Sequence, residues 1–289
     1  MTLDLLIPDS TVRITRVGLG CARLFGGVER RASARLIEAA LGAGIRHFDT
    51  APAYGSEDVI GDILAGVSDI TIATKVGIPR PPEGGTIRKV FLGPVYRRTI
   101  RPLLARAPGA KAALLRVASA RRKPRPSQPP RSLGRAEVMQ NLEESLHRLR
   151  RTCIDLYLLH EPEHLQITEE LRELFDALKA RGMIGAFGLA YGGKATRHVR
   201  FGTVVQQRHD ADDAGHSPAG CAQIYHGVLR HGRGEAGDAG DRLRAPMLIR
   251  NVLDRDPHCA VIVSASSPAQ ITEVGQWAGN GRSAVRAFT

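Results

Sequence analysis

The sequence lacks any apolar run approaching the roughly 20 residues that a membrane-spanning helix needs. Cysteine is scarce, and Cys21, Cys153, Cys221 and Cys259 lie far apart without a CxxC pair, which predicts reduced thiols rather than a disulfide framework or a zinc site. The N-terminal stretch MTLDLLIPDS carries an aspartate where a secretion signal is basic. These absences predict a cytoplasmic protein without a metal site.

Acidic residues are nearly missing from one segment, 78–134. It holds fourteen lysines and arginines against the single acid Glu83, a local net charge of +13. The whole chain carries +12, so the rest of it carries −1 and is close to neutral. If the protein binds an anionic partner, we therefore expect this segment to form the contact.

Eight short apolar runs recur along the remaining chain, most of them separated by helical patterns. They occupy 16–21, 45–49, 69–75, 154–160, 183–190, 203–207, 222–227 and 260–265. Near-continuous runs of this length are typical of strands buried on both faces of a parallel sheet.

Helical periodicity is clear in three of the intervening segments, 29–44, 136–151 and 168–182, the last with Thr168 as the expected N-cap. It is weaker over 57–65, 241–253 and 268–278. The polar, irregular stretch 208–221 predicts a crossover with little or no helix.

Eight strands with mostly helical crossovers predict an α/β fold, a (β/α)8 TIM barrel that forms a single domain over 1–289. The basic segment 78–134 would be an insertion in the third βα loop, on the face where active sites form. An open doubly wound sheet is the structural alternative. VGLGCARLFGG is not a dinucleotide fingerprint, because Arg23 occupies the third glycine position of GxGxxG.

Three polar residues end successive apolar runs: Asp49, Lys75 and His160. Tyr54 follows Asp49 in the stretch FDTAPAYG. Each alone has an ordinary explanation, as a turn or cap aspartate, a solvated lysine, a structural histidine or a packed tyrosine. Together they favour one shared site, because a barrel brings the carboxyl ends of its strands to one face.

The residue types suit proton donation. A tyrosine has an ordinary pKa near 10, and an adjacent ammonium group favours the phenolate and lowers that pKa. Asp49 would balance the charge of Lys75, and His160 would orient a reacting carbonyl or assist proton transfer. We therefore predict that Tyr54 is the acid and that Lys75 and Asp49 support it.

With these residues in place, the chain resembles the aldo-keto reductase superfamily. The matching motifs are GLGCARLFGG, HFDTAPAYGSEDVIGDIL, TIATKVG, NLEESLHRLRRTCIDLYLLHEP, ALKARGMIGAFGLA and VIVSASSPAQI, in this order, with 78–134 as an unmatched insertion. The resemblance implies a barrel and hydride transfer between NAD(P)H and a carbonyl or alcohol. It makes Asp49, Tyr54, Lys75 and His160 a catalytic tetrad with Tyr54 as acid and base.

The same resemblance implies a cofactor site formed by Gly20, Ala190, Tyr191, Gln206, Tyr225, Ser264, Ser266 and Gln270. Gln206 would bind the carboxamide and Tyr225 would stack on the nicotinamide, while Ala190 and Tyr191 replace the usual Ser-Asn pair. Ser264 and Gln270 stand where NADP-using members carry a lysine and an arginine, so NAD and NADP both stay open. Serine hydroxyls would then bind ribose or phosphate.

Two other functions stay open. One is a cofactor-binding regulator without catalysis, suggested by the missing Ser-Asn pair. The other is a tether to an anionic membrane surface or to nucleic acid through 78–134. The segment has only two aromatic residues that could stack on bases, Phe91 and Tyr96, which argues against recognition of single-stranded nucleic acid. We favour a cationic lid or subunit contact. A further hypothesis is that such a lid attracts phosphorylated or carboxylated substrates. The expected ligand is a small carbonyl or alcohol, and the sequence indicates no obligate protein partner.

Overall fold

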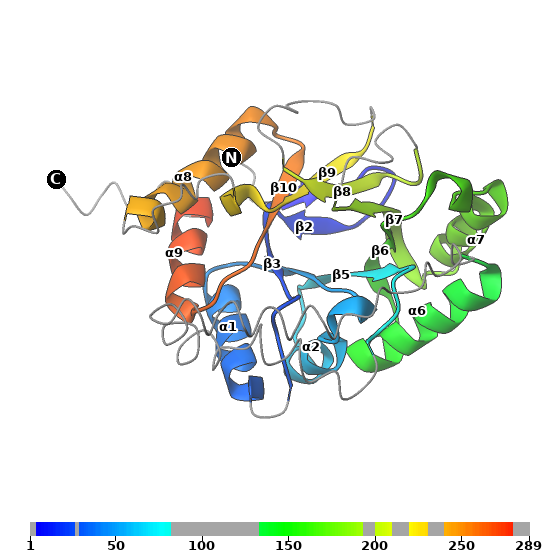
Figure 1. The fold of residues 1–289 in the computed structure, drawn as a ribbon, viewed down its shortest axis with the longest axis horizontal. Helices are drawn as coiled ribbons and strands as arrows, with labels where there is room; N and C mark the ends of the chain where they lie inside the picture. Colours follow the sequence, from blue (N-terminus) through cyan, green and yellow to red (C-terminus); the bar gives the residue numbers. More distant parts are fainter. Residues whose placement is uncertain are drawn as a thin grey trace, which may run out of the picture. The chain divides into compact units, whose positions relative to one another are not determined.

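Eight parallel strands close into a barrel, with the helices on its outside (Figure 1). The structure, a computed structural model, describes residues 4–26, 29–81, 133–192, 200–209, 220–230 and 240–279. By its contacts the chain divides into two compact units, Met1–Arg80 with Leu133–Thr289, and Pro81–Ser132, and the barrel belongs to the first. Most of the predicted insertion 78–134 lies outside the described residues.

The barrel strands follow one another around the ring in chain order, and the last pairs with the first. This closure confirms the predicted TIM barrel and excludes the open doubly wound sheet. The strands are β3 (Val17–Gly20), β4 (His47–Asp49), β5 (Thr71–Val76), β6 (Ile154–His160), β7 (Ile184–Tyr191), β8 (Val204–Arg208), β9 (Ala222–His226) and β10 (Cys259–Val263).

The helices confirm both the clear and the weaker periodic segments. They are α1 (Arg30–Gly42), α2 (Glu57–Ile63), α6 (Arg135–Leu149), α7 (Glu169–Ala180), α8 (Gly240–Arg255) and α9 (Pro268–Gly279). Thr168 caps α7 as predicted, because its hydroxyl accepts a hydrogen bond from the Leu171 backbone N–H at 3.2 Å. Most of the crossover 208–221 lies outside the described residues. Among the helices that are described, none has the length and apolar character to span a bilayer.

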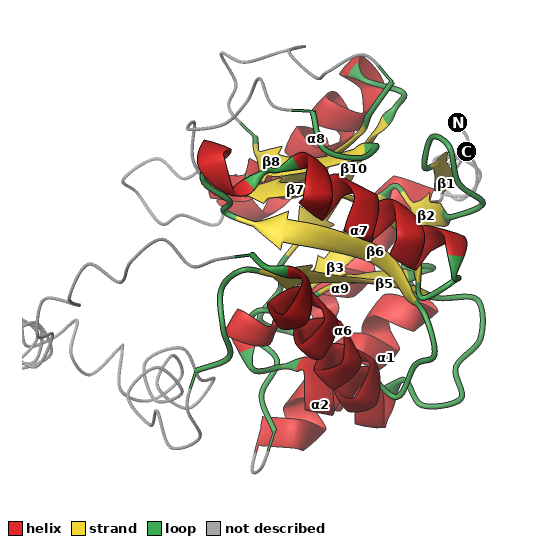
Figure 2. Cartoon of the chain, turned by 90° about the vertical axis from the view of Figure 1, so that its right-hand side faces the viewer, coloured by secondary structure: helices red, strands yellow, loops and turns green. Residues whose placement is uncertain are grey.

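A small antiparallel hairpin precedes the barrel and was not predicted. Its strands are β1 (Asp4–Leu6) and β2 (Arg13–Thr15), and Figure 2 shows it at the end where the barrel strands begin. Leu5, Ile7, Val12 and Ile14 pack into the same apolar cluster as the inward-facing residues of the barrel. The hairpin therefore covers the base of the barrel and leaves the opposite end for a site.

Side chains alternate between two apolar layers along each strand. The inner layer holds small and branched residues such as Leu156, Leu158 and Ala222. The outer layer, between strands and helices, holds aromatic residues such as Tyr157 and Phe175, whose rings stack at 5.4 Å. Because the period is two, the side chain two positions beyond the last inner-layer residue also points inward, at the carboxyl end of its strand.

Helices α2 and α6 are joined by a buried ion pair. The Glu57 carboxylate is fully buried, accepts a hydrogen bond from the Thr74 hydroxyl at 2.7 Å and pairs with Arg148 Nε at 2.9 Å. The helices also touch closely at Gly61, where a Cβ would lie 2.1 Å from the Arg148 carbonyl oxygen. This contact fixes α2, which begins three residues after Tyr54.

Replacing Arg148 with methionine is expected to destabilise the fold by about 3 kcal/mol, because it leaves a buried carboxylate without its counter-charge. Urea unfolding at pH 7 measures this change. Arg150→Met is the matched control: Arg150 pairs with Asp62 but its side chain is 60% exposed, so a loss of at most about 1 kcal/mol is expected. Equal losses in the two variants would contradict the special role of the buried pair.

Candidate active site

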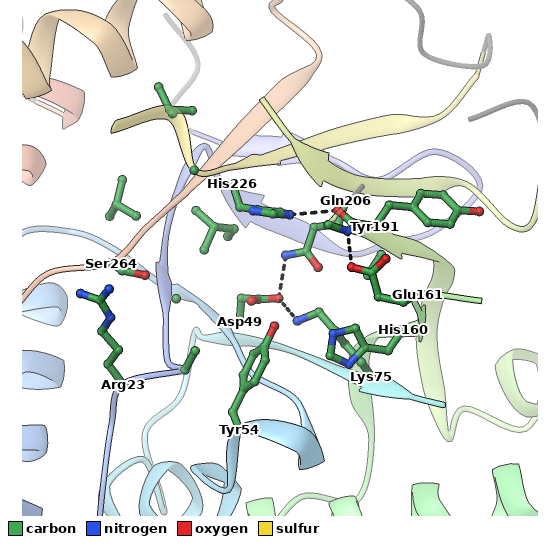
Figure 3. A pocket seen from close by; sticks show the side chains of 18 of the residues that line it. Arg23, Asp49, Tyr54, Lys75, His160, Glu161, Tyr191, Gln206, His226 and Ser264 are labelled. Carbon is green, nitrogen blue, oxygen red and sulfur yellow. Dashed lines mark hydrogen bonds and ion pairs between the residues drawn. The ribbon is translucent and has the colours of Figure 1, made fainter. Parts of the chain in front are cut away.

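Polar side chains from the strands converge at the carboxyl end of the barrel, opposite the hairpin (Figure 3). They follow the inner register of their strands, directly above the inner apolar layer. They surround a cavity of about 350 Å³. Its lining includes Gly20, Asp49, Tyr54, Lys75, His160, Ala190, Tyr191, Gln206 and Ser264 from the sequence prediction, together with Arg23, Glu161 and His226.

A buried ion pair lies at the floor of this cavity. Lys75 Nζ donates to Asp49 Oδ1 at 2.7 Å and to the Thr50 carbonyl oxygen at 2.8 Å, and the two side chains are only 2% and 7% exposed. Burial alone would lower the pKa of Lys75, but the charge of Asp49 and the nearby Tyr54 raise it above its ordinary value. Lys75 is therefore an ammonium group at neutral pH.

Tyr54 lies above this pair. It ends the short 3-10 helix η2 (Pro52–Tyr54), and the chain then turns at Gly55, whose φ of 67° favours glycine. Lys75 Nζ lies 5.0 Å from the centre of the tyrosine ring, and the His160 ring contacts that ring edge-on at 5.8 Å. The predicted tetrad residues thus lie together in space.

The net pKa shift of Tyr54 differs from the sequence expectation. Burial is the largest effect and raises the pKa of the hydroxyl, while the charge of Lys75 and a hydrogen bond with it lower that pKa. Asp49 and Glu161 add smaller upward contributions, and the net shift is upward. Lys75 acts in the predicted direction, but the cost of desolvating a phenolate outweighs it. Tyr54 consequently holds its proton at neutral pH.

His160 is neutral in this environment. Burial, followed by the charge of Lys75, lowers the pKa of its imidazole to about 3. Its Nδ1 atom is buried and has no hydrogen-bond partner among the described residues. A neutral imidazole carries one N–H and can donate a hydrogen bond into the cavity without changing the charge of the site.

Gln206 joins the ion pair from the far side of the barrel. Its Nε2 donates to Asp49 Oδ1 at 2.8 Å, so that this one oxygen accepts hydrogen bonds from both Gln206 and Lys75. The Gln206 Oε1 atom is buried without a partner in the described part of the chain. An acceptor is therefore open at the cavity floor.

Three predicted cofactor residues do not line the cavity. Tyr225 was expected to face it, but its side chain lies in the outer apolar layer, where its ring contacts His209 at 5.4 Å; its neighbour His226 points inward instead. The prediction for Tyr225 is therefore wrong, since Ala222 and Ile224 fix the inner register of β9. Ser266 and Gln270 lie beyond Ser264 and bond to each other at 3.0 Å.

Three lining residues with ionisable side chains, Arg23, Glu161 and His226, were not predicted as site residues. His226 could have been found by counting two positions on from Ile224, and its Nε2 lies 3.0 Å from the Tyr191 carbonyl oxygen. Glu161 directly follows His160, and Arg23 had been considered only as an obstacle to a glycine motif. Arg23 and Ser264 lie together, away from His160 and Glu161 (Figure 3). Within the described ranges, no cluster of three or more His, Cys, Asp or Glu side chains could hold a metal ion.

Comparison with known proteins gives consistent matches. The sequence profile of the aldo/keto reductase family matches residues 16–200. The aldo-keto reductase YhdN of Bacillus subtilis is 28% identical over 194 residues, which cover 64% of this chain and 45% of that protein. The uncharacterized oxidoreductase YqkF of the same organism is 26% identical, with 63% and 46% covered. The chain thus spans less than half the length of these curated relatives.

Solved structures share the fold over nearly the whole chain. The glycerol dehydrogenase AKR11B4 from Gluconobacter oxydans superposes with a TM-score of 0.66 at 21% identity, covering 95% of this chain and 90% of that one. An aldo-keto reductase from Klebsiella pneumoniae, solved in complex with NADPH, superposes with a TM-score of 0.63 at 18% identity, covering 96% and 90%.

Two buried histidines of the barrel interior should make the protein less stable in acid. Burial lowers the pKa of His47 to about 4 and that of His160 to about 3, against about 6.5 in the unfolded chain. Below pH 6.5 these two histidines are protonated in the unfolded chain but stay neutral in the native protein. The free energy of unfolding therefore falls as the pH drops towards 4. His160→Gln should reduce the loss between pH 7 and pH 5 by about 2 kcal/mol, measured by urea unfolding.

His258→Gln is the control for this experiment, because His258 lies on the surface. Its pH dependence should match that of the wild type. An undiminished acid loss in His160→Gln would show that His160 is not held neutral.

Proposed function

The chain belongs to the aldo/keto reductase family, and on this premise we propose that it is an NAD(P)-dependent oxidoreductase that interconverts a carbonyl compound and an alcohol. The observation that carries the proposal is the position of Tyr54 in the cavity beside the buried Lys75–Asp49 pair. An acid in this position can protonate a substrate oxygen that gains negative charge in the cavity.

When bound, the nicotinamide supplies or accepts the hydride at the substrate carbon. In reduction, the carbonyl oxygen gains negative charge, and Tyr54 gives it the proton of its hydroxyl. The resulting phenolate is stabilised by the Lys75 ammonium, whose own charge is balanced by Asp49. In oxidation, the same phenolate takes the proton of the alcohol, so one group serves both directions.

His160 would orient the substrate. Its imidazole is neutral and contacts the Tyr54 ring, so an imidazole N–H can donate to the same oxygen that Tyr54 protonates. A neutral donor polarises the carbonyl without competing with Tyr54 as the acid. We therefore assign proton transfer to Tyr54 and orientation to His160.

The cavity has features that suit a nicotinamide cofactor. The unpartnered Gln206 Oε1 could accept a hydrogen bond from a carboxamide N–H. Gly20 allows close packing at the cavity edge, because a Cβ there would lie 2.9 Å from Ile262 Cγ2 and 3.0 Å from Ser264 Oγ. The Arg23 guanidinium and the Ser264 hydroxyl could bind phosphate oxygens at the other end. Ala190 and Tyr191 line the wall of the cavity. Tyr225 is outside the lining, so we do not propose that it stacks on the nicotinamide.

Tyr54→Phe is expected to lower kcat for an aldehyde such as 4-nitrobenzaldehyde by about 1,000-fold, because the variant keeps the ring and loses the proton donor. Binding of NADH or NADPH, followed by the fluorescence of the reduced nicotinamide, should change by less than about twofold. Tyr225→Phe is the matched control and should retain wild-type turnover, since Tyr225 lies outside the cavity. Wild-type activity in Tyr54→Phe would remove Tyr54 from its assigned role.

The choice between NADH and NADPH is expected to respond to position 270. Gln270 lies in the first turn of α9, where its uncharged side chain accepts a hydrogen bond from the Ser266 backbone N–H at 2.8 Å. Gln270→Arg should tighten NADPH binding about tenfold with little change for NADH, because a charge-assisted hydrogen bond to the 2′-phosphate becomes available. Gln140→Arg, on the exposed face of α6, adds the same charge elsewhere and should change neither affinity. Equal effects of the two variants would exclude a phosphate site at α9.

A further inference from the structure

Glu161 places a carboxylate on the wall of the cavity, one residue beyond His160. Its backbone has a φ of 52°, in the left-handed region that residues other than glycine seldom adopt. The Glu161 N–H donates to the Ala190 carbonyl oxygen at 2.8 Å, and the side-chain Oε1 accepts from the Gly192 N–H. The hydrogen bond from Gly192 therefore holds the carboxylate at the end of β7, and the backbone of Glu161 adopts an energetically unfavourable conformation there.

The second carboxylate oxygen, Oε2, accepts no hydrogen bond from the described residues. Among the described residues, no cation pairs with Glu161 and no donor binds this oxygen. A carboxylate that is fixed through one oxygen and open at the other is an acceptor for a ligand hydroxyl or ammonium group, and it repels a ligand carboxylate or phosphate.

The charges around Tyr54 do not cancel the charge of Glu161. Lys75 is already balanced by Asp49, and burial keeps both His160 and His226 from protonation at neutral pH. The lining cation Arg23 lies with Ser264 at the other end of the cavity (Figure 3). Arg208, at the end of β8, lowers the pKa of His226 through its charge, but it does not line the cavity. In the described part of the site, the end that holds the reacting groups therefore has a net negative charge.

Glu161 and Tyr54 line the same cavity, and the charge of Glu161 adds the smallest of the upward contributions to the pKa of Tyr54. A substrate oxygen that receives the Tyr54 proton must then lie in the same field. The Glu161 side chain is exposed to solvent, so its charge acts mainly on groups within a screening length of about 8–10 Å, which in this site are the ligand groups that enter the cavity beside it.

We propose that Glu161 determines the substrate class of this site: uncharged or cationic aldehydes and ketones are accepted, and those with a carboxylate or phosphate near the carbonyl are rejected. The inference rests on the proposed function, because it concerns the substrate of that reaction. It is opposite in sign to the expectation from the basic segment 78–134, which favours anionic substrates.

The test uses one pair of substrates, 4-carboxybenzaldehyde and its methyl ester, which differ mainly in charge. The wild-type protein is expected to show a kcat/KM at least tenfold higher for the ester. Glu161→Gln keeps an oxygen for the Gly192 N–H and removes the charge, so the ester-to-acid ratio should fall at least fivefold, mainly through faster turnover of the acid.

Glu163→Gln is the matched control. It removes the same charge two residues away, at an exposed position outside the cavity lining, and should keep the wild-type ratio. Turnover of both compounds with an unchanged ratio in Glu161→Gln, or a wild-type ratio near one, would overturn the role of Glu161 alone. Failure of every variant to turn over either compound with NADH or NADPH would overturn the proposed function and this inference with it.

Discussion

The Lys75–Asp49 ion pair is the interaction on which the site depends, and it in turn depends on closure of the barrel. An ammonium group that is 2% exposed is stable only if its charge is balanced and its donors are satisfied. Asp49 and the Thr50 carbonyl oxygen do this from β4 and its following loop, while Gln206 on β8 donates to the same carboxylate oxygen. Strands β4 and β8 are not neighbours in the ring, so they meet only across its interior. An open sheet with the same strands would leave the carboxylate without its second donor.

Much of this arrangement could be predicted because it follows from two simple regularities. Apolar runs located the strands, and the polar residue that ends each run located Asp49, Lys75 and His160. Where the strand period was not applied, the prediction failed. Tyr225 was chosen by resemblance to a motif, whereas the inner positions Ala222 and Ile224 already assign the next inward position to His226. The hairpin β1–β2 escaped notice for another reason: its three-residue strands are too short for alternation to stand out.

Other properties of the site could not be read from the sequence, because they depend on packing. The pKa of Tyr54 results from a competition between burial and the charge of Lys75. The sequence predicts that Lys75 lies near Tyr54, but it does not show how deeply the Tyr54 hydroxyl is buried. The same holds for charge. The net charge of +12 comes from 78–134, whereas the charge that the structure places in the wall of the cavity is the carboxylate of Glu161. A basic segment can increase the association rate of an anionic substrate, while a carboxylate in the cavity wall still weakens the binding of that substrate by electrostatic repulsion.

The raised pKa of Tyr54 is consistent with its proposed part in the reaction. A general acid has to keep its proton until the substrate oxygen develops charge, and burial ensures this by making the isolated phenolate costly. The same burial strengthens the attraction between a phenolate and the Lys75 ammonium once the proton has left, because charges interact more strongly where water is excluded. Burial therefore opposes ionisation at rest and supports it in the transition state. Asp49 makes this arrangement stable, since without it the pKa of the buried lysine would fall and the phenolate would lose its partner.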